Sequence, residues 1–208
     1  SYFGAKPLQI VGIHVLAGGV NKYDIAAEVY NPNESFVIFF SYYFTVGDNK
    51  TVSKNTFLLP GESRPVAILG IDGSNALNSP ILIMEKLHWQ RISAHKVKDI
   101  KLWQAYRLNF EVSSSTFLAV SAKTGMGPNA NVIQFKLTNS SPYNYKEPEF
   151  FVGLYQGSSL VGLLPLRLDA IKSLETKDID LRSFASNFNA TSVILYPLIN
   201  IYGKDAYF

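Results

Sequence analysis

A hard stop between two strong strand signals constrains this chain more than any other feature. Residues 23–30 alternate between apolar and polar faces, with the period of two that is typical of a half-buried strand. Asn31-Pro32-Asn33 ends this run, because proline has no N–H to donate to a β-ladder and asparagine readily adopts turn conformations. The next run, residues 35–46, is β-branched and aromatic almost throughout. The chain must therefore end one strand and begin another within a few residues.

The same pattern recurs 108 residues further along the chain. Residues 132–138 alternate in the same way and then stop at Asn139-Ser140-Ser141-Pro142. The same shift aligns residues 152–159 with residues 44–51, and each of these segments reads as a strand that enters a tight turn. A strand–stop–strand–turn unit that occurs twice with identical internal spacing predicts a tandem duplication.

Turn sequences divide the rest of the chain into short segments that favour strands. Turn sequences at residues 47–50 and 60–63 separate further β-branched and aromatic runs. Tyrosine and phenylalanine, with 12 and 14 copies, favour strands over helices. Helical periodicity appears nowhere for long enough to matter, so the sequence predicts an all-β fold.

The duplication also predicts the domain organisation. A chain of 208 residues is long enough for two small domains that each bury a core. Residues 93–106 belong to neither repeat and contain no Pro, Gly or Ser-rich linker, so we expect a short, ordered connection there. We predict a first domain at residues 1–100 and a second at residues 101–208. The inward faces are expected to include Ile25, Ala27, Val29, Phe36, Ile38, Phe40, Ile133, Phe135, Leu137 and Leu154.

These turn signals resemble those of a known domain family. The first copy contains Asn31-Pro32-Asn33, then "FTVGD" at residues 44–48, then "LPGE" at residues 59–62. The second copy contains "NSS" at residues 139–141, then "LYQ" at residues 154–156, with a degraded "RLDAIKS" where the Pro-Gly turn should be. This pattern resembles the FxLYD-type β-sandwich domain, which is related to the water-stress and late-embryogenesis-abundant sandwich.

The resemblance covers about residues 8–205, and its motifs are turns rather than chemistry. It implies two tandem immunoglobulin-like antiparallel β-sandwiches. The tandem arrangement is also similar to uncharacterised membrane-anchored surface proteins of bacteria, in which two such domains follow an N-terminal transmembrane helix. An extracytoplasmic location at the cell envelope or surface is the expectation that follows.

Composition excludes several classes of function. The chain has no cysteine, which rules out disulfides, thiolate metal sites and cysteine nucleophiles. A net charge of +3 is too mild and too evenly scattered to indicate nucleic-acid binding. The longest apolar run, residues 36–46, is shorter than the roughly 20 residues that a spanning helix needs. Because the sequence begins without methionine, we interpret it as a mature or truncated product, which leaves open whether a signal or anchor preceded it.

Candidate ligand and catalytic residues are few. The histidines His14, His88 and His95 form no H-x-x-x-H pair, and we expect no zinc site. "GMGPNA" at residues 125–130 matches G-x-G-x-x-A, but a proline and an asparagine stand where a helix should begin, so a loop between strands is the favoured interpretation. No G-x-S-x-G nucleophile elbow is present.

The acidic residues are interpreted in the same way. Glu175, Asp178 and Asp180 fall close together, and the last two share a face of an expected strand. A solvated face is favoured over a weak calcium contact, because no glycine-bearing calcium loop accompanies them. Asp48 and Asn49 form a good turn sequence rather than a metal site. We therefore predict no catalytic, cofactor-binding or metal-binding residues, and no enzyme activity.

A basic cluster and a set of glycosylation sequons leave alternatives open. Arg91, Lys96, Lys98 and Lys101 are flanked by Trp89 and Trp103, with Lys96 and Lys98 on one face of an expected extended segment. A solvated edge that discourages strand aggregation is favoured, with an interdomain or anionic-surface contact as the alternative. Four N-x-[ST] sequons stand at Asn33, Asn49, Asn139 and Asn189.

The sequence thus predicts a non-enzymatic structural or protein-binding module of the cell envelope. A protein partner or a second copy would bind at sheet edges or faces, without nucleic acid, and the membrane would be reached only through a missing N-terminal anchor. A subunit of a surface filament or layer is the first alternative, and a carbohydrate-binding module that stacks sugars on tryptophan is the second. The candidate contact residues are Tyr30, Phe39, Tyr43, Trp89 and Trp103.

Overall fold

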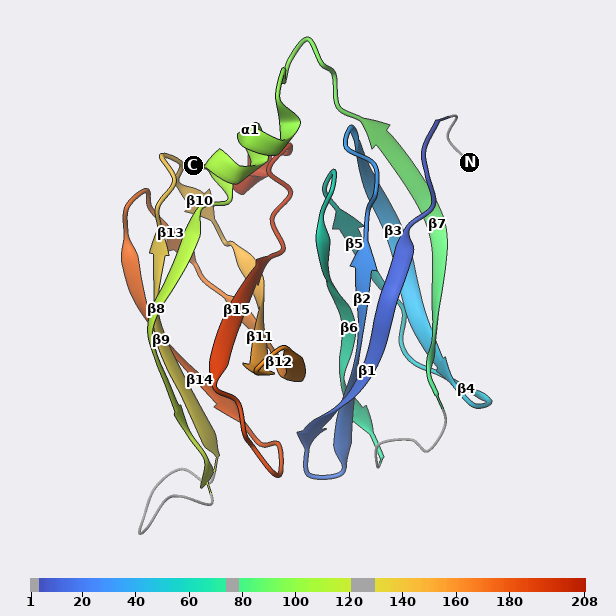
Figure 1. The fold of residues 1–208 in the computed structure, drawn as a ribbon, viewed down its shortest axis with the longest axis vertical. Helices are drawn as coiled ribbons and strands as arrows, with labels where there is room; N and C mark the ends of the chain where they lie inside the picture. The colour runs from blue at the N-terminus through green and yellow to red at the C-terminus, as the bar shows by residue number, and fades with distance from the viewer. Residues whose placement is uncertain (1–3, 74–78, 121–129) are drawn as a thin grey trace. The chain divides into compact units, whose positions relative to one another are not determined.

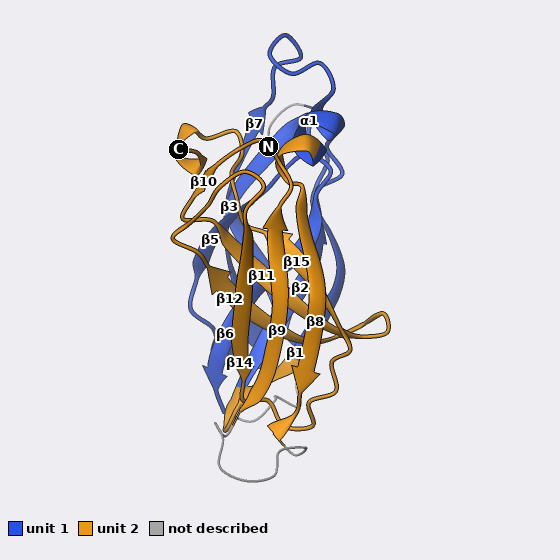
Figure 2. Cartoon of the chain, turned by 90° about the vertical axis from the view of Figure 1, so that its left-hand side faces the viewer, with its two compact units in different colours: residues 1–15, 23–105 blue, residues 16–22, 106–208 orange. Residues whose placement is uncertain are grey.

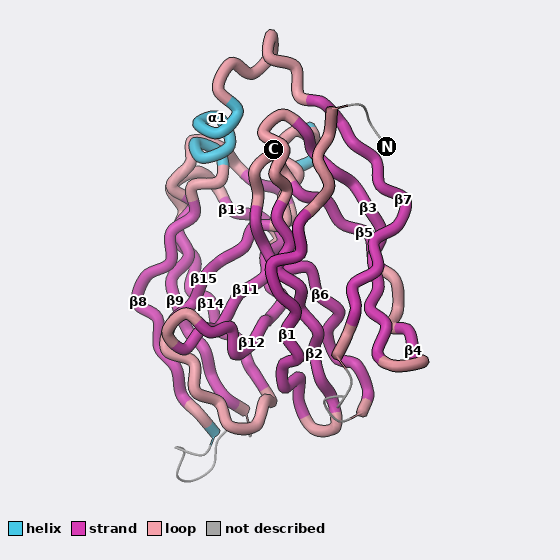
Figure 3. Tube along the Cα trace, turned by 45° about the vertical axis from the view of Figure 1, so that its right-hand side comes forward, coloured by secondary structure: helices cyan, strands magenta, loops and turns pink. Residues whose placement is uncertain are grey.

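A computed structural model describes residues 4–73, 79–120 and 130–208 of the chain (Figure 1). Strands dominate these residues, and the described part contains a single short α-helix, α1 (Ile100–Arg107), as Figure 3 shows. A 3-10 turn, η2 (Lys204–Ala206), lies near the C-terminus. The prediction of an all-β fold is confirmed.

The chain divides into two compact units (Figure 2). Unit 1 comprises residues 1–15 and 23–105, and unit 2 comprises residues 16–22 and 106–208. The strands before α1 are β1 (Gln9–Gly19), β2 (Lys22–Tyr30), β3 (Phe36–Val46), β4 (Asn49–Lys50), β5 (Lys54–Leu58), β6 (Ser63–Asp72) and β7 (Ile81–Arg91). The strands after α1 are β8 (Phe110–Leu118), β9 (Asn131–Asn139), β10 (Tyr145–Lys146), β11 (Glu149–Gln156), β12 (Ser159–Arg167), β13 (Ala170–Ile171), β14 (Thr176–Ser183) and β15 (Ser192–Pro197).

The sheets before and after α1 follow the same plan. Before α1, one sheet has the order β1–β2–β6, and in the other β3 pairs with β4 and β5 on one side and with β7 on the other. After α1, the orders are β8–β9–β14 and β12–β11–β15, with β10 and β13 forming a small extra ladder. The strands β2, β3 and β6 before α1 thus correspond to β9, β11 and β14 after it. The ladders of β3, β9 and β11 are antiparallel.

Alternating burial explains why these segments form strands with a common core. In β9 every second residue is buried, and in β3 the inward residues of an almost continuous apolar run pack against β2. All of the residues that the sequence predicted to face inward are buried, with at most 8% of their surface exposed. The core of unit 1 contains Tyr23, Ile25, Ala27, Val29, Ile38, Phe40, Tyr42, Phe44, Val46, Leu58, Val66, Ile68 and Leu82.

The α-helix corrects the expectation that residues 96–98 are extended and that no helix forms. Residues 94–96 form a turn, and α1 begins at Ile100 after three intervening residues. The Asp99 side chain caps the helix, accepting a hydrogen bond from the Leu102 N–H at 3.0 Å. Lysine, leucine, glutamine, alanine and arginine within the helix are good helix formers. Eight residues are too few to display a helical period, which is why the pattern was missed.

Within the described residues, no helix has the length and apolar character needed to cross a membrane.

Candidate functional site

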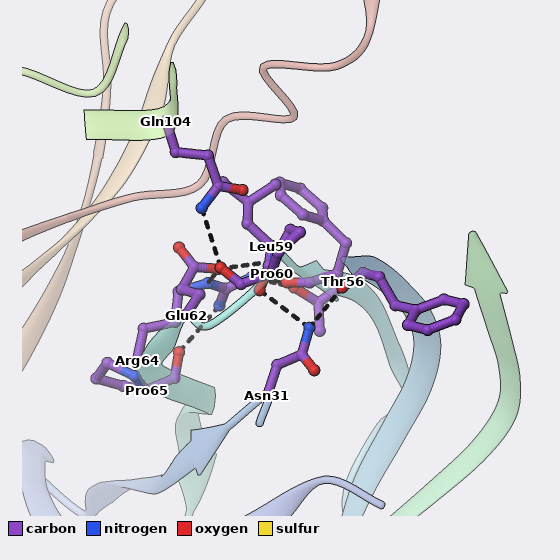
Figure 4. Close-up of polar contacts among 10 residues, drawn as sticks. Asn31, Thr56, Leu59, Pro60, Glu62, Arg64, Pro65 and Gln104 are labelled. Carbon is purple, nitrogen blue, oxygen red and sulfur yellow. Dashed lines mark hydrogen bonds and ion pairs between the residues drawn. The ribbon is translucent and has the colours of Figure 1, made fainter. Parts of the chain in front are cut away.

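The stop that ends β2 is built around a buried asparagine, Asn31 (Figure 4). Its Nδ2 donates hydrogen bonds to the carbonyl oxygens of Phe36 at 2.8 Å and Leu59 at 3.0 Å. Its Oδ1 accepts from the backbone N–H of Asn33 at 3.1 Å and from the Asn33 amide at 2.9 Å. One side chain therefore joins the end of β2 to the start of β3 and to the turn before β6.

A buried ion pair adjoins this asparagine at the same turn. Arg64, with 1% of its side chain exposed, directs Nε toward Glu62 Oε1 at 3.3 Å. Its Nη atoms also donate to Thr56 Oγ1 at 2.9 Å and to the carbonyls of Pro65 and Phe57. Burial raises the pKa of Glu62 above its ordinary 4.5, while the Arg64 guanidinium and a backbone N–H act in the opposite direction. The pair is committed to holding β5 and β6 together.

The helix α1 is tied to this turn within unit 1. Gln104 Nε2 donates a hydrogen bond to the carbonyl oxygen of Pro60 at 2.9 Å (Figure 4). The Pro60 carbonyl belongs to the "LPGE" turn, which also receives the Asn31 amide. The connection between the repeats is therefore fixed to the same point as the strand ends.

Unit 2 repeats these bonds around Asn139, which is also fully buried. Its Nδ2 donates to the carbonyls of Tyr143 at 2.7 Å and Lys172 at 3.1 Å. Its Oδ1 accepts from the N–H and the Oγ of Ser141 at 3.1 and 2.7 Å. The backbone N–H of Asn139 bonds the Glu175 carbonyl, as that of Asn31 bonds the Glu62 carbonyl.

The turn that meets Asn139 is "KSLE", residues 172–175, which overlaps the end of the degraded segment identified in the sequence. The Lys172 N–H donates to Glu175 Oε1 at 2.8 Å, as the Leu59 N–H donates to Glu62 Oε1 at 3.1 Å. Leu174 has φ +63°, close to the +67° of Gly61. The sequence hid this turn because it contains neither proline nor glycine.

Even the ion pair has a counterpart. Lys177 stands two residues after Glu175, as Arg64 stands two residues after Glu62, and its Nζ lies 3.8 Å from Glu175 Oε2. The counterpart is about one-third exposed, whereas the Arg64 side chain is buried. The two turns therefore share one plan, and burial of the charged pair distinguishes the first.

The most distinctive surface in unit 1 is the side of the β5–β3–β7 sheet that faces away from the core, called here the β3 outer face. Phe39 lies opposite Phe57 and His88 in register, with ring centroids 6.2 and 6.3 Å apart. Tyr43 carries the Lys50 Nζ 5.4 Å above its ring. The residues of the β3 outer face are Phe39, Ser41, Tyr43, Lys50, Asn55, Phe57, Ile83, Glu85 and His88.

The predicted contact residues do not all lie on that face. Phe39 and Tyr43 do, and both are half-buried. Tyr30 is half-buried on β2, in the other sheet of unit 1. Trp89 lies opposite Ile38 and packs against the core, edge-on to another ring, and Trp103 is a half-buried residue of α1. Sequence alternation identified the outward residues of β3, but it could not predict that β5 and β7 pair with β3 and place their residues beside them.

One histidine has a carboxylate neighbour that the sequence did not reveal. His14 Nε2 lies 3.7 Å from Glu28 Oε2, across the β1–β2 pair. Neither residue is near the other in the local sequence, so only strand pairing brings them together. Among the residues that the structure describes, no group of three or more histidine, aspartate or glutamate side chains is arranged to hold a metal.

The acidic residues of β14 are engaged with neighbouring strands. Asp178 accepts from Lys136 Nζ at 2.8 Å, and Asp180 accepts from Gln134 at 2.8 Å and Arg182 at 2.6 Å. These pairs form a solvated face of the sheet. The segment "GMGPNA" lies outside the described residues, apart from its last residue.

Unit 2 contains a tyrosine cluster that sequence reasoning missed. The Arg107 guanidinium lies 4.4 Å from the ring centroid of Tyr143, whose ring also contacts Tyr207. The Tyr145 hydroxyl donates to the Arg107 carbonyl at 2.6 Å. Burial, and then the neighbouring Tyr207, raise the pKa of Tyr145, so its phenol keeps its proton to a higher pH than an ordinary tyrosine does.

No known protein family matches the chain, and no curated protein matches it either. The function is therefore inferred from the geometry of the units themselves.

Proposed function

We propose that this chain is a non-enzymatic structural or protein-binding module of two tandem immunoglobulin-like β-sandwiches, and that it works at the cell envelope. The observation that carries the proposal is the β3 outer face. Half-buried aromatic rings lie at its centre, and the charged groups of Lys50 and Glu85 lie beside them. Aromatic centres with polar rims are typical of protein–protein contact surfaces.

The repeated sheet order supports the tandem organisation. Each set of strands forms two main sheets, in which corresponding strands pair in the same order, and each set places a buried asparagine at the same corner. Duplicated bonds of this kind are expected when one domain has been copied. The proposed domains are residues 1–100 and 101–208, and the division of the chain after Ala105 supports this proposal, although residues 16–22 group with unit 2.

Irregularities in two edge strands, β7 and β8, favour a sheet face rather than a sheet edge as the contact surface. In β7 two residues, Lys86 and Leu87, stand opposite Phe40, and Lys86 has φ +54°. A similar irregularity interrupts β8, where Ser114 has φ +55°. Bulges of this kind protect an edge against pairing with another strand. Lateral assembly into a filament through these edges is correspondingly disfavoured.

The ionisable groups support a role without catalysis. Glu62 and Arg64 hold a turn, and the carboxylates of β14 pair with neighbouring strands. A catalytic acid, base or nucleophile needs a group that is positioned toward a substrate rather than committed to the fold.

The envelope location and an N-terminal anchor follow from the resemblance to bacterial surface proteins.

Site-specific photo-crosslinking in the native host tests the proposal. A photoreactive phenylalanine analogue at Tyr43, on the β3 outer face, is expected to give one discrete adduct with a partner protein. The same analogue at Asp178, on the solvated face of β14, serves as the control and is expected to give none. Equal adducts from both positions, or none from position 43, would refute a specific contact at this face.

Light scattering on the purified chain distinguishes the filament alternative. A module that binds a partner is expected to be monomeric at micromolar concentration. A mass that rises with concentration would instead favour a self-assembling subunit.

A further inference from the structure

A cationic segment with exposed apolar side chains follows β7. Arg91, Lys96, Lys98 and Lys101 are all exposed. Asp99 is the single acidic residue between positions 91 and 106, and its carboxylate is occupied by the N-terminus of α1. In the described chain, no carboxylate lies within ion-pair distance of the three lysines. The positive charge of this segment is thus directed to solvent.

The helix α1 exposes two apolar side chains close in sequence to Lys101. None of the eight residues of α1 is buried. Leu102 is 66% exposed and Tyr106 is 57% exposed, and residues four apart lie on one face of a helix. Gln104 points the opposite way, to the Pro60 carbonyl. The Tyr106 ring meets the Tyr143 ring edge-on, with centroids 6.0 Å apart, and the rest of its surface and the Leu102 side chain remain open to solvent.

The segment is pre-organised rather than loose. Val97 and Ile92 are buried, each with 8% exposure, and the Ile92 N–H bonds the Ser35 carbonyl at 2.7 Å. The Val97 N–H bonds the Ser93 carbonyl at 3.0 Å, which closes the turn. Burial of Val97 directs its two lysine neighbours outward. In Figures 1 and 3 this loop projects beyond the ends of the strands of unit 1.

We propose that residues 91–106 form a docking site for an anionic membrane surface. Each lysine near such a surface contributes roughly 1 kcal/mol, and tyrosine favours the headgroup region. Leu102 and Tyr106 would enter the interface while Lys96, Lys98 and Lys101 meet the lipid phosphates. A purely phosphate-reading site for nucleic acid needs charge alone and gives the exposed Leu102 no role. The combination of charge and apolar exposure therefore favours lipid.

The site lies at the end of unit 1 where the described chain begins. Lys6 exchanges two backbone-to-side-chain hydrogen bonds with Asn33, at 2.7 and 2.8 Å, and the Asn33 carbonyl accepts from Gly61 in the turn that contacts α1. If the N-terminal anchor proposed above exists, it would hold this end against the bilayer. Only this step rests on the proposed function, because binding of the segment to lipid requires no anchor and no protein partner.

Vesicle flotation with the 208-residue chain tests the site directly. The chain is expected to float with vesicles that contain phosphatidylglycerol, to remain behind with pure phosphatidylcholine, and to dissociate as salt is raised. Lys96→Gln/Lys98→Gln/Lys101→Gln should weaken binding by about fivefold per lysine. The matched control, Lys54→Gln/Lys146→Gln/Lys172→Gln, removes the same charge from exposed positions elsewhere and should bind like the wild type.

A second pair of variants separates the apolar contribution. Leu102→Ser and Tyr106→Ser should each weaken vesicle binding without changing its dependence on salt, and circular dichroism checks that both remain folded. No flotation with anionic vesicles, or an equal loss in the control triple variant, would overturn the proposal. Duplex DNA that binds the chain in the absence of vesicle binding would replace the lipid site with a nucleic-acid site.

Discussion

At the scale of single residues, the fold depends on Asn31 and Asn139. Each satisfies two carbonyl groups and one backbone N–H in a buried corner. Replacing either by alanine leaves these groups without partners, so Asn31→Ala and Asn139→Ala are each expected to lower the free energy of unfolding by about 3 kcal/mol. Urea denaturation measures the change.

The control for these variants is Asn189→Ala. Asn189 is exposed and bonds the side chain of a surface glutamine, so a change within about 0.5 kcal/mol is expected. A loss as small as this for Asn31→Ala would show that the corner does not depend on its asparagine.

The buried Asp24 predicts a pH dependence. Burial raises the pKa of its carboxyl above the ordinary 3.8, against the Gly70 N–H that donates to it at 2.7 Å. A raised folded-state pKa favours folding below pH 3.8, and this contribution is lost as the pH rises through the folded value. Asp24→Asn keeps the acceptor and stays neutral, so it should be more stable than the wild type at neutral pH.

The gain from Asp24→Asn should disappear in acid, where the wild-type carboxyl is protonated in both states. Urea midpoints of the two proteins at neutral and acidic pH give the comparison. A gain of equal size at both pH values would contradict a charge-based origin.

At the scale of elements, the two turns provide a matched experiment. Leu174 and Gly61 occupy the same left-handed backbone position, and Leu174 is 75% exposed. A non-glycine residue there costs roughly 1 kcal/mol, so Leu174→Gly should raise the free energy of unfolding by about that amount. A Cβ at position 61 meets no atom within 4 Å, so Gly61→Ala should cost a similar amount through its backbone alone.

Urea denaturation of both variants gives the two changes. Opposite signs are expected. A destabilised Leu174→Gly would mean that flexibility in the unfolded chain outweighs the relief of strain.

Local chemistry decided which elements could be predicted from the sequence. The strands β2 and β9 were predictable from the alternation of apolar and polar residues, and β3 from its β-branched and aromatic run, while Pro32 marks a stop by itself. The helix α1 and the "KSLE" turn were not, because one is too short for a period and the other lacks Pro and Gly. On the β3 outer face, alternation gave Phe39, but only strand register placed His88 beside it.

At the scale of the whole molecule, the strands before and after α1 repeat one plan of sheets and corners but carry different surfaces. The first has a buried Glu62–Arg64 pair and an aromatic outer face. The second has a half-buried Lys177 in place of the arginine and a tyrosine cluster around Arg107. The shared corners preserve the fold while the exposed faces differ, so we propose that any partner distinguishes the two copies.

If the two copies fold as separate domains, their unfolding can be observed separately. Both tryptophans of the chain, Trp89 and Trp103, lie in unit 1, so tryptophan fluorescence reports that unit, whereas far-ultraviolet circular dichroism reports both. Asn31→Ala should move the fluorescence transition to lower urea. Asn139→Ala should move part of the dichroism transition and leave the fluorescence midpoint in place. Equal shifts of both signals in both variants would mean that the chain unfolds as one cooperative structure.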